Sequence, residues 1–331
     1  MAVADARAAL PSAPGVYRFR DGRGRVLYVG RASNLRRRVD SYWGGLRDRA
    51  HLTRMVARIA RIEAVACDSA HEAAWLERNV LERAMPRWNR TPGGQEVPVY
   101  IRLDTGSRSP GLRTVHSVQS TGDARYFGPY LGGAKVRLAV AALHRVLPLA
   151  YAADGLRGAE RDMARVRGVA PAGRDALIEA VSAVLDRDPA AASTLRAELV
   201  RRRDGAAGAL AFELAGRLHE EIEALDWAVG AQRVTLAQPR DFDVCGWAAG
   251  VLVRFEVRAG LMCAWTQREC SAAGARPLLA STPAGWAPFA QRNAELAAEL
   301  LAGRKGRAEV RSPARPTPAQ AATSSASTAV S

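Results

Sequence analysis

Two tyrosines near the amino terminus stand on segments whose pattern predicts a β-hairpin. Tyr17 and Tyr28 lie within Val16–Phe19 and Val26–Val29, two short runs rich in Val, Tyr and Phe that are typical of strands. Asp21-Gly22-Arg23-Gly24 lies between the runs and is typical of a turn. We therefore expect the two phenol groups to share one face of a hairpin.

An arginine-rich segment follows the hairpin and predicts a short helix. Asn34 is a suitable N-cap for a helix through Trp43, with Leu35 and Val39 in its apolar row. Arg38 lies at the edge of that row, and Tyr42 follows one turn later. A second helix over Leu52–Ala60 and a third strand over Ile62–Cys67 are expected next.

A glutamate occupies the apolar side of the following predicted helix. Ser69-Ala70-His71-Glu72 has the pattern of a capping box, and the helix should end near Pro86. At about 100° per residue, Glu77 falls in the middle of the apolar row, while the opposite side carries Trp75, Arg78, Asn79 and Glu82. The row itself consists of Ala73, Leu76, Val80, Leu81 and Ala84.

A carboxylate on a buried row needs a cation, because burying it unpaired is costly. One interpretation is a structural salt bridge to one of the many arginines. The other is a metal site for phosphodiester hydrolysis, in which the cation polarises the phosphate and arginines neutralise transition-state charge. A phenol, with a usual pKa of about 10, can act as the base when nearby positive charge lowers that value. Tyr17 could instead be a packed core residue.

Composition favours a polyanionic partner. The 331 residues carry a formal net charge of +15, almost entirely from arginine, since Lys135 and Lys305 are the only lysines. Nucleic acid is the expected partner, although an arginine-rich composition could also reflect genomic base content. Near the proposed site, the basic side chains Arg36, Arg37, Arg54 and Arg58 would contact phosphates and not bases. A solvated basic face is the alternative for Arg36 and Arg37.

The spacing of the cysteines and the length of the apolar runs indicate the cellular compartment. Cys67, Cys245, Cys263 and Cys270 form no C-x-x-C pair, so a zinc or iron-sulfur site is not indicated, and scattered thiols suit a reducing cytoplasm. No run approaches the roughly 18 apolar residues of a membrane span, and the amino terminus lacks a signal pattern. We expect a cytoplasmic protein with no membrane partner.

Further along the chain, helical patterns dominate. Tyr126–Tyr130, YFGPY, is expected to form an aromatic turn before a helix that ends near Leu147. Helices over Ala191–Arg203 and Ala207–Val229, joined at Asp204-Gly205, predict an antiparallel hairpin with one apolar seam. A second β-hairpin is expected over residues 251–266.

Several separated motifs together resemble one nuclease family. GVY at Gly15–Tyr17 and YVG at Tyr28–Gly30 resemble the two halves of the GIY-YIG signature. GRASNLRRRVDSY, WLERNVLERAMPRWN and YFGPY resemble the excision-repair endonuclease UvrC and its short relative Cho, in register over about the first 150 residues. The implied fold class is α/β: a GIY-YIG fold with a small three-stranded antiparallel sheet flanked by helices, then a mainly helical region with a UVR-like helical hairpin, and a short β-containing C-terminal part.

The resemblance also implies roles for particular residues. Tyr28 corresponds to the proposed general base, with Tyr17 as its partner or the alternative base, and Arg38 and Glu77 to the catalytic arginine and the ligand of one Mg²⁺ or Mn²⁺. Supporting positions are Gly30, which would allow close approach to the phosphate, together with Asn34, Tyr42 and Asn89. Arg31 departs from the family, which usually has lysine there; arginine keeps the charge and changes the geometry.

Downstream, the resemblance is looser. Residues 205–229 resemble the hairpin with which UvrC docks on UvrB, although an ordinary amphipathic hairpin has the same pattern. Tyr151–Ala170 lacks the cysteines that hold an iron-sulfur cluster in UvrC, so we expect no cluster. The implied divisions are 1–92 (nuclease), 93–150 (linker), 151–190 (degenerate cysteine-rich region), 191–232 (hairpin), 233–302 (entry to the second half of UvrC) and 303–331 (disordered tail).

The expected function is a metal-dependent endonuclease that makes one incision in damaged or structured DNA, in nucleotide excision repair or a related pathway. A catalytically silent adaptor that binds DNA or UvrB, and a nuclease for branched DNA or RNA outside excision repair, are the alternatives.

Overall fold

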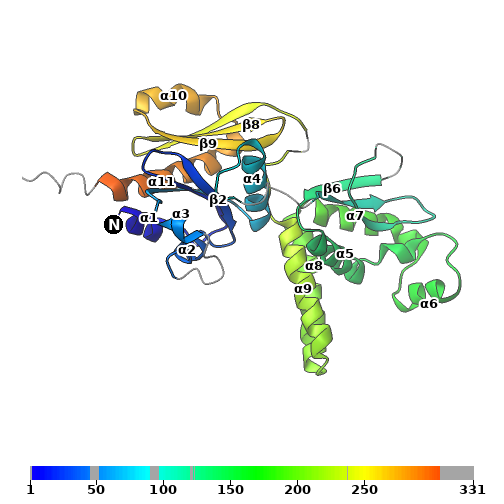
Figure 1. The fold of residues 1–331 in the computed structure, drawn as a ribbon. Coiled ribbons are helices and arrows are strands. Elements are labelled where there is room, and N and C mark those ends of the chain that lie inside the picture. Colours follow the sequence, from blue (N-terminus) through cyan, green and yellow to red (C-terminus); the bar gives the residue numbers. More distant parts are fainter. Residues whose placement is uncertain are drawn as a thin grey trace, which may run out of the picture.

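The computed structural model describes residues 2–44, 52–89, 97–119, 122, 124–236 and 238–305. They form two lobes joined near α4 (Ala70–Arg83) (Figure 1). One lobe contains both ends of the described chain, and the other contains the middle of the sequence. The predicted α/β class, with a three-stranded antiparallel sheet at the amino terminus and a mainly helical middle region, is confirmed.

The first sheet consists of β1 (Gly15–Arg20), β2 (Val26–Ala32) and β3 (Arg61–Ala66) in the order β2-β1-β3, all antiparallel. Tyr17 lies opposite Gly30 and Phe19 opposite Tyr28, so these side chains share one face, as the hairpin pattern predicted.

Short helices cover this face of the sheet. They are α1 (Ala2–Ala9), α2 (Leu35–Asp40) and α3 (Thr53–Val56). Buried Leu10, Leu35, Val39 and Met55 pack with Tyr17 in one core cluster. The second predicted helix, Leu52–Ala60, is shorter than expected, and α1 had no prediction.

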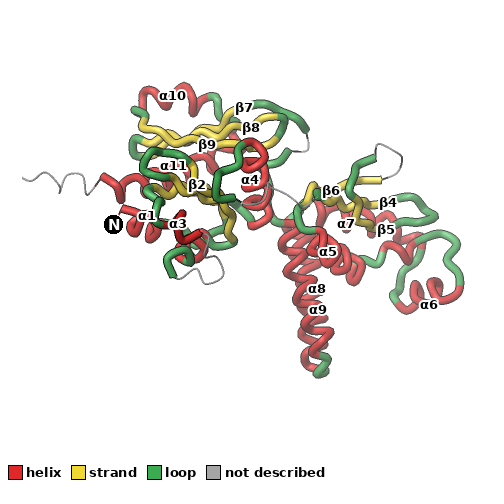
Figure 2. The backbone as a smooth tube through the Cα atoms, in the orientation of Figure 1, coloured by secondary structure: helices red, strands yellow, loops and turns green. Residues whose placement is uncertain are grey.

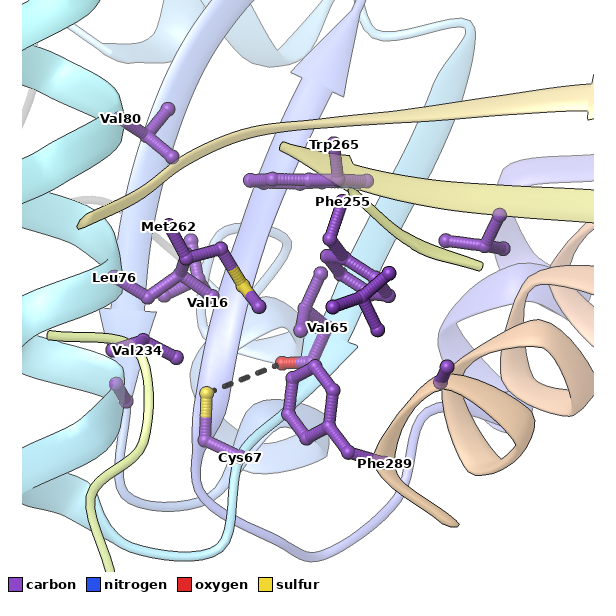
Figure 3. Packing of buried hydrophobic residues seen from close by; sticks show 14 of the residues in the cluster. Val16, Val65, Cys67, Leu76, Val80, Val234, Phe255, Met262, Trp265 and Phe289 are labelled. Atoms are coloured by element: carbon purple, nitrogen blue, oxygen red, sulfur yellow. Dashed lines mark hydrogen bonds between the residues drawn. The ribbon is translucent and has the colours of Figure 1, made fainter. Parts of the chain in front are cut away.

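The opposite face of the first sheet is covered by the C-terminal part of the chain. β7 (Phe242–Ala248), β8 (Val251–Arg258) and β9 (Leu261–Glu269) form an antiparallel meander, followed by α10 (Ala272–Ala280), η4 (Ala284–Trp286) and α11 (Ala287–Lys305). Figure 3 shows Val16 and Val65 of the first sheet in one cluster with Phe255 and Trp265 of the second. Burial of this shared apolar surface stabilises both sheets together.

A buried ion pair crosses the same interface. Arg18 pairs with the buried Glu63, donates from Nη2 to the carbonyl oxygen of Trp265 at 2.9 Å, and lies with its Cζ 4.0 Å from the Trp265 ring centroid. Arg20 and Arg61 also contact Glu63, at 3.0 Å each. The Glu63 charge is thus compensated inside the interface.

The side of α4 opposite the predicted apolar row is also partly buried. Trp75 and Asn79 are buried, because the residues after α9 and the second sheet cover that side of α4. Asn79 Nδ2 lies 3.2 Å from both Val234 O and Thr235 Oγ1. The predicted N-cap is present, since Ser69 Oγ accepts from the amide of Glu72.

The second lobe combines a small sheet with helices. β4 (Val99–Asp104), β5 (Gly111–Val115) and β6 (Ala124–Tyr130) have the order β5-β4-β6. The YFGPY segment is therefore a strand that pairs with β4, and the predicted turn is wrong. The remaining elements are α5 (Gly133–Val146), η2 (Leu149–Ala152), α6 (Gly158–Val166), η3 (Pro171–Gly173), α7 (Arg174–Leu185), α8 (Pro189–Gly208) and α9 (Phe212–Val229).

The helical hairpin α8–α9 projects from the body of the molecule (Figure 2). Its turn lies at residues 209–211, whereas Asp204-Gly205, the predicted joint, is inside α8. Leu218, Ile222 and Leu225 are buried along the seam.

The predicted tail, residues 303–331, begins inside α11, which continues to Lys305; residues 306–331 lie outside the described part. The other domain divisions remain predictions. No helix in the described part of the chain is long and apolar enough to cross a membrane.

Candidate active site

Three tyrosines and one arginine converge on the helix-covered face of the first sheet. The ring centroids of Tyr17, Tyr28 and Tyr42 are 6.0 to 6.3 Å apart. The Tyr17 and Tyr42 hydroxyls form a hydrogen bond of 2.8 Å, and the Tyr42 hydroxyl also interacts with that of Tyr28. Arg38 approaches from α2, with its Cζ 5.6 Å from the Tyr42 ring centroid. The three hydroxyl groups therefore form one linked set beside a guanidinium.

Exposure separates the tyrosines. Tyr17 is fully buried and Tyr42 is 2% exposed, whereas Tyr28 is only partly buried. Of the three, Tyr28 is therefore the one best placed to meet a substrate.

Gly30 has a packing role in this arrangement. A Cβ at this position would lie 2.5 Å from the Tyr17 hydroxyl oxygen and 2.8 Å from Tyr28 Cε1. Only glycine leaves room for the two rings. Packing alone therefore explains a glycine here, without the close approach to phosphate that the sequence suggested.

Burial and mutual repulsion keep the phenols protonated. Burial, together with the neighbouring Tyr28, raises the pKa of Tyr17 to about 12. The pKa values of Tyr28 and Tyr42 are also raised, mainly by burial, while Arg38 acts in the opposite direction on both. Burial acts to lower the pKa of Arg38, but the adjacent phenols outweigh it and the net change is upward. A phenolate here needs added positive charge.

Glu77 lies beside this cluster and faces Arg31. Its Oε1 accepts from the Arg31 backbone amide at 3.1 Å, and its Oε2 is 3.3 Å from Arg31 Nε. The Glu77 side chain is 21% exposed. Its negative charge contributes to the raised pKa of Tyr28, so the carboxylate and the phenol are electrostatically coupled.

The residues around Glu77 fit a hard divalent cation that keeps most of its water. Carboxylate oxygen suits Mg²⁺ and Mn²⁺, and Mg²⁺ commonly uses only one or two carboxylates plus substrate phosphate. No group of three or more His, Cys, Asp or Glu residues able to hold a metal occurs among the described residues. The Arg31 guanidinium beside Glu77 shows that positive charge is accommodated at this carboxylate.

A polar pocket of about 340 Å³ opens next to Arg38. It is lined by Arg31, Ala32, Ser33, Asn34, Arg37, Arg38 and Ser41. Asn34 is the N-cap of α2, as predicted, and accepts from the Arg37 amide at 2.9 Å. Ser33 and Ser41 were missed from the sequence; the only signal is a small hydroxyl residue at each end of a short arginine-rich helix.

Asn89 closes the free edge of β2. Its Oδ1 accepts from the Val29 amide at 3.0 Å, and its Nδ2 donates to the Val29 carbonyl at 2.8 Å. The side chain thereby replaces a neighbouring strand beside Tyr28 and holds that part of the hairpin.

The predicted basic surface divides into separate environments. Arg37 lines the pocket, but Arg36 donates from Nε to the Leu10 carbonyl at 2.7 Å and so fixes the end of α1 against α2. Arg54 and Arg58 are exposed near α3. The neighbouring Arg47, Arg49 and His51 lie outside the described residues.

Comparison with known proteins supports the resemblance over this same region. The family model for the UvrC-like GIY-YIG domain matches residues 13–90. This segment is a UvrC-like GIY-YIG domain.

The UvrC-like GIY-YIG domain has many curated relatives. UvrABC system protein C of Geobacter metallireducens is 38% identical over 143 residues, which are 43% of this chain and 23% of that protein. The protein of the same name from Symbiobacterium thermophilum is 32% identical over 265 residues, 76% of this chain and 42% of its own length. The chain thus spans well under half of the length of these relatives.

A solved structure of the GIY-YIG N-terminal endonuclease domain of UvrC from Thermotoga maritima, bound to its catalytic magnesium, is 26% identical to this chain. It aligns with 26% of this chain and 94% of that one, with a TM-score of 0.24.

Proposed function

We propose that the chain cleaves a phosphodiester bond of DNA by hydrolysis, with Mg²⁺ or Mn²⁺ held by Glu77. The observation that carries this proposal is geometric. The Tyr17 and Tyr42 hydroxyls are hydrogen-bonded beside Arg38, and Glu77 accepts from the backbone of β2, the strand that carries Tyr28. The similarity to proteins named UvrABC system protein C supports a role in nucleotide excision repair.

Each side chain has a role suited to its position. Tyr28, the most accessible of the three, accepts the proton of the attacking water in its ionised form, and Tyr42, hydrogen-bonded to Tyr17, orients its oxygen. Arg38 neutralises charge that develops on the phosphate. When bound, the divalent cation supplies a Lewis acid for the phosphate and positive charge that favours a phenolate. Arg37 and Ser33 would hold a neighbouring phosphate in the polar pocket.

The test is nicking of supercoiled plasmid by the purified chain with Mg²⁺. We expect relaxation by the parent, loss of about 10²-fold or more in Glu77→Gln, and unchanged activity in Arg196→Gln, a variant of a half-exposed ion pair between α8 and α9. Equal nicking rates for Glu77→Gln and the parent would contradict the proposed role of Glu77 in the mechanism. A parent that binds DNA and never nicks it would support the adaptor.

The substrate class requires its own comparison. Rates on damaged duplex, undamaged duplex, branched DNA and structured RNA would separate excision repair from the alternative nuclease. The described residues contain one active-site cluster of this kind. We therefore propose one incision per encounter, measured as one nicked strand per substrate molecule.

UvrB is the proposed protein partner, through residues 205–229. Leu210, Phe212 and Leu214 at the tip of the α8–α9 hairpin are 73%, 67% and 44% exposed, an apolar surface of the kind that marks a docking site. We expect Phe212→Ser to abolish capture by UvrB, while Val166→Ser, at an apolar residue of α6 that is 81% exposed, leaves it intact. Retention by Phe212→Ser would contradict the assignment.

A further inference from the structure

The outer face of the sheet β4–β6 carries arginines and tyrosines that the proposed active site does not use. In the strand register, Arg102 lies between Arg113 on β5 and Tyr126 on β6, so the three side chains form one row on one face. Tyr100 stands two residues before Arg102 and points to the same side. The sheet belongs to the lobe that does not contain the GIY-YIG domain (Figure 1).

Asp104 fixes the two arginines in this row. Its Oδ1 accepts from Arg102 Nε at 2.7 Å, and its Oδ2 accepts from Arg113 Nε and Nη2 at 2.9 and 2.6 Å. Asp104 is nearly buried, whereas the Arg113 side chain is 62% exposed. A guanidinium has five donors, so both arginines retain N–H groups for another acceptor while their directions are fixed.

Tyr126 adds an aromatic surface next to Arg102. The Arg102 Cζ lies 5.9 Å from the Tyr126 ring centroid. The Tyr126 hydroxyl is enclosed and makes no hydrogen bond within the described part of the chain. A ligand would therefore meet this residue through its partly exposed ring.

The charge of this region favours an anionic ligand. Residues 97–131 contain four arginines and two aspartates, with no lysine or glutamate. Arg125 is paired with Asp186 of α7, and Arg108 is exposed in the β4–β5 connection. The three arginines other than Arg125 still exceed the combined charge of Asp104 and Asp123.

We propose that the outer face of β4–β6 binds single-stranded DNA. Rings on an exposed strand face can stack on unpaired bases, while fixed guanidinium groups bind the phosphates between them. A base inside a duplex offers no free ring face, and this flat surface presents no helix to a groove. The inference rests on the proposed action on DNA, and places a second contact in the lobe away from the incision site.

The test measures binding without cleavage. Full-length protein is titrated against a fluorescein-labelled 20-nucleotide strand and its duplex, in EDTA, with anisotropy as the readout. We expect Arg113→Gln and Tyr126→Leu each to weaken binding of the strand by about tenfold. Arg196→Gln, which removes the same charge from a half-exposed ion pair between α8 and α9, should change it less than twofold.

A second readout identifies the surface directly. An oligonucleotide containing 5-iodouracil should photocrosslink to peptides of β4 or β6 in the parent. Crosslinks confined to residues 13–90, or strand binding by both variants that equals the parent's, would overturn the proposal, as would equal losses for strand and duplex. Binding in EDTA requires no turnover, so a chain that fails to nick DNA can still confirm this surface, and an active nuclease can still contradict it.

Discussion

Arg31 and the proposed cation would compete for the same carboxylate. The Arg31–Glu77 ion pair is partly exposed, which limits its strength to about 1 kcal/mol or less. We predict that Arg31→Gln lowers the half-saturating Mg²⁺ concentration of nicking by up to about fivefold, because the competing guanidinium is gone. The backbone amide of Arg31 still donates to Glu77 in this variant.

Mg²⁺ titration at saturating DNA is the measurement. Arg37→Gln is the matched control, because Arg37 lines the same pocket and no contact with Glu77 is described. That control should weaken DNA affinity and leave the Mg²⁺ requirement unchanged. A higher Mg²⁺ requirement in Arg31→Gln would mean that the arginine assists cation binding.

The raised pKa of Tyr28 predicts a base-limited reaction. Burial and the nearby Tyr42 and Glu77 favour the protonated phenol, so the phenolate is a minor form near neutral pH. Its fraction grows about tenfold per pH unit below its pKa, and the nicking rate should rise with pH between about 6 and 9. Tyr28→Phe should lose about 10²- to 10⁴-fold in rate.

Single-turnover rates across this pH range test the assignment. The residual activity of Tyr28→Phe should lose the pH slope of the parent. A flat profile in the parent, or the same slope in both proteins, would assign the proton transfer to another group.

At the scale of elements, sequence patterns correctly predicted the structures that depend on contacts between residues close in sequence. The hairpin around Tyr17 and Tyr28 and the caps at Asn34 and Ser69 depend on contacts within a few residues. The site residues could be placed for the same reason: most stand on three consecutive elements or on α4. The arginine pairing of Glu77 was one of the two predicted alternatives, and the choice of Arg31 needed the fold.

Contacts across long stretches of sequence account for the errors. Local patterns could not predict that Trp75 and Asn79 are buried. Trp75 donates to the carbonyl of Pro129, 54 residues away, and Asn79 contacts residues more than 150 positions away. The YFGPY segment reads as a turn because Gly and Pro are frequent in turns, yet pairing with β4 makes it a strand. Asp204-Gly205 tolerates helix because packing of α8 against α9 overrides a weak local preference.

His71 in the first turn of α4 links three elements and predicts an acid-sensitive joint. It is buried, accepts from Trp75 Nε1 at 3.0 Å, and its ring lies 5.3 Å from Tyr130 of β6 and 4.8 Å from Trp227 of α9. Burial, with a smaller effect of Arg187, lowers its pKa to about 3. In the unfolded chain, His71 binds a proton below about pH 6.5. In the folded state, it binds one only at much lower pH.

The direction of the pH effect on stability follows from the lowered pKa of His71. Between about pH 6.5 and 3 the unfolded chain binds more protons, so stability falls as the pH falls. From pH 7 to pH 5 this residue alone should remove about 2 kcal/mol. We predict that His71→Gln, which keeps an acceptor for Trp75, loses that much less stability over the same interval.

Urea unfolding at the two pH values measures the difference. The other titratable groups contribute equally to the pH dependence of stability in parent and variant. The difference between the two proteins therefore isolates the contribution of His71. Identical losses would show that the joint accommodates the charged ring.

At the scale of the whole molecule, the GIY-YIG domain and the C-terminal sheet form one folding unit. Val16 and Val65 on the first sheet, Phe255 and Trp265 on the second, and Phe289 on α11 belong to one buried cluster (Figure 3). Segments more than 170 residues apart in sequence thus depend on each other, while the lobe between them has its own core.

This arrangement predicts that damage in the second sheet weakens the nuclease site. Trp265→Ala removes a 1% exposed side chain, and such truncations cost about 3–5 kcal/mol. Because Arg18 would lose its ring contact and Glu63 would gain water, the amides of β1 and β3 should exchange with solvent faster. Hydrogen exchange followed by mass spectrometry should show this loss of protection in residues 15–20 and 61–66, with β4–β6 unchanged. Leu143→Ala, in the separate core of the other lobe, should give the reverse pattern. Protection of β1 and β3 that survives Trp265→Ala would mean that the GIY-YIG domain is held by its own helices and that the second sheet is merely attached to it.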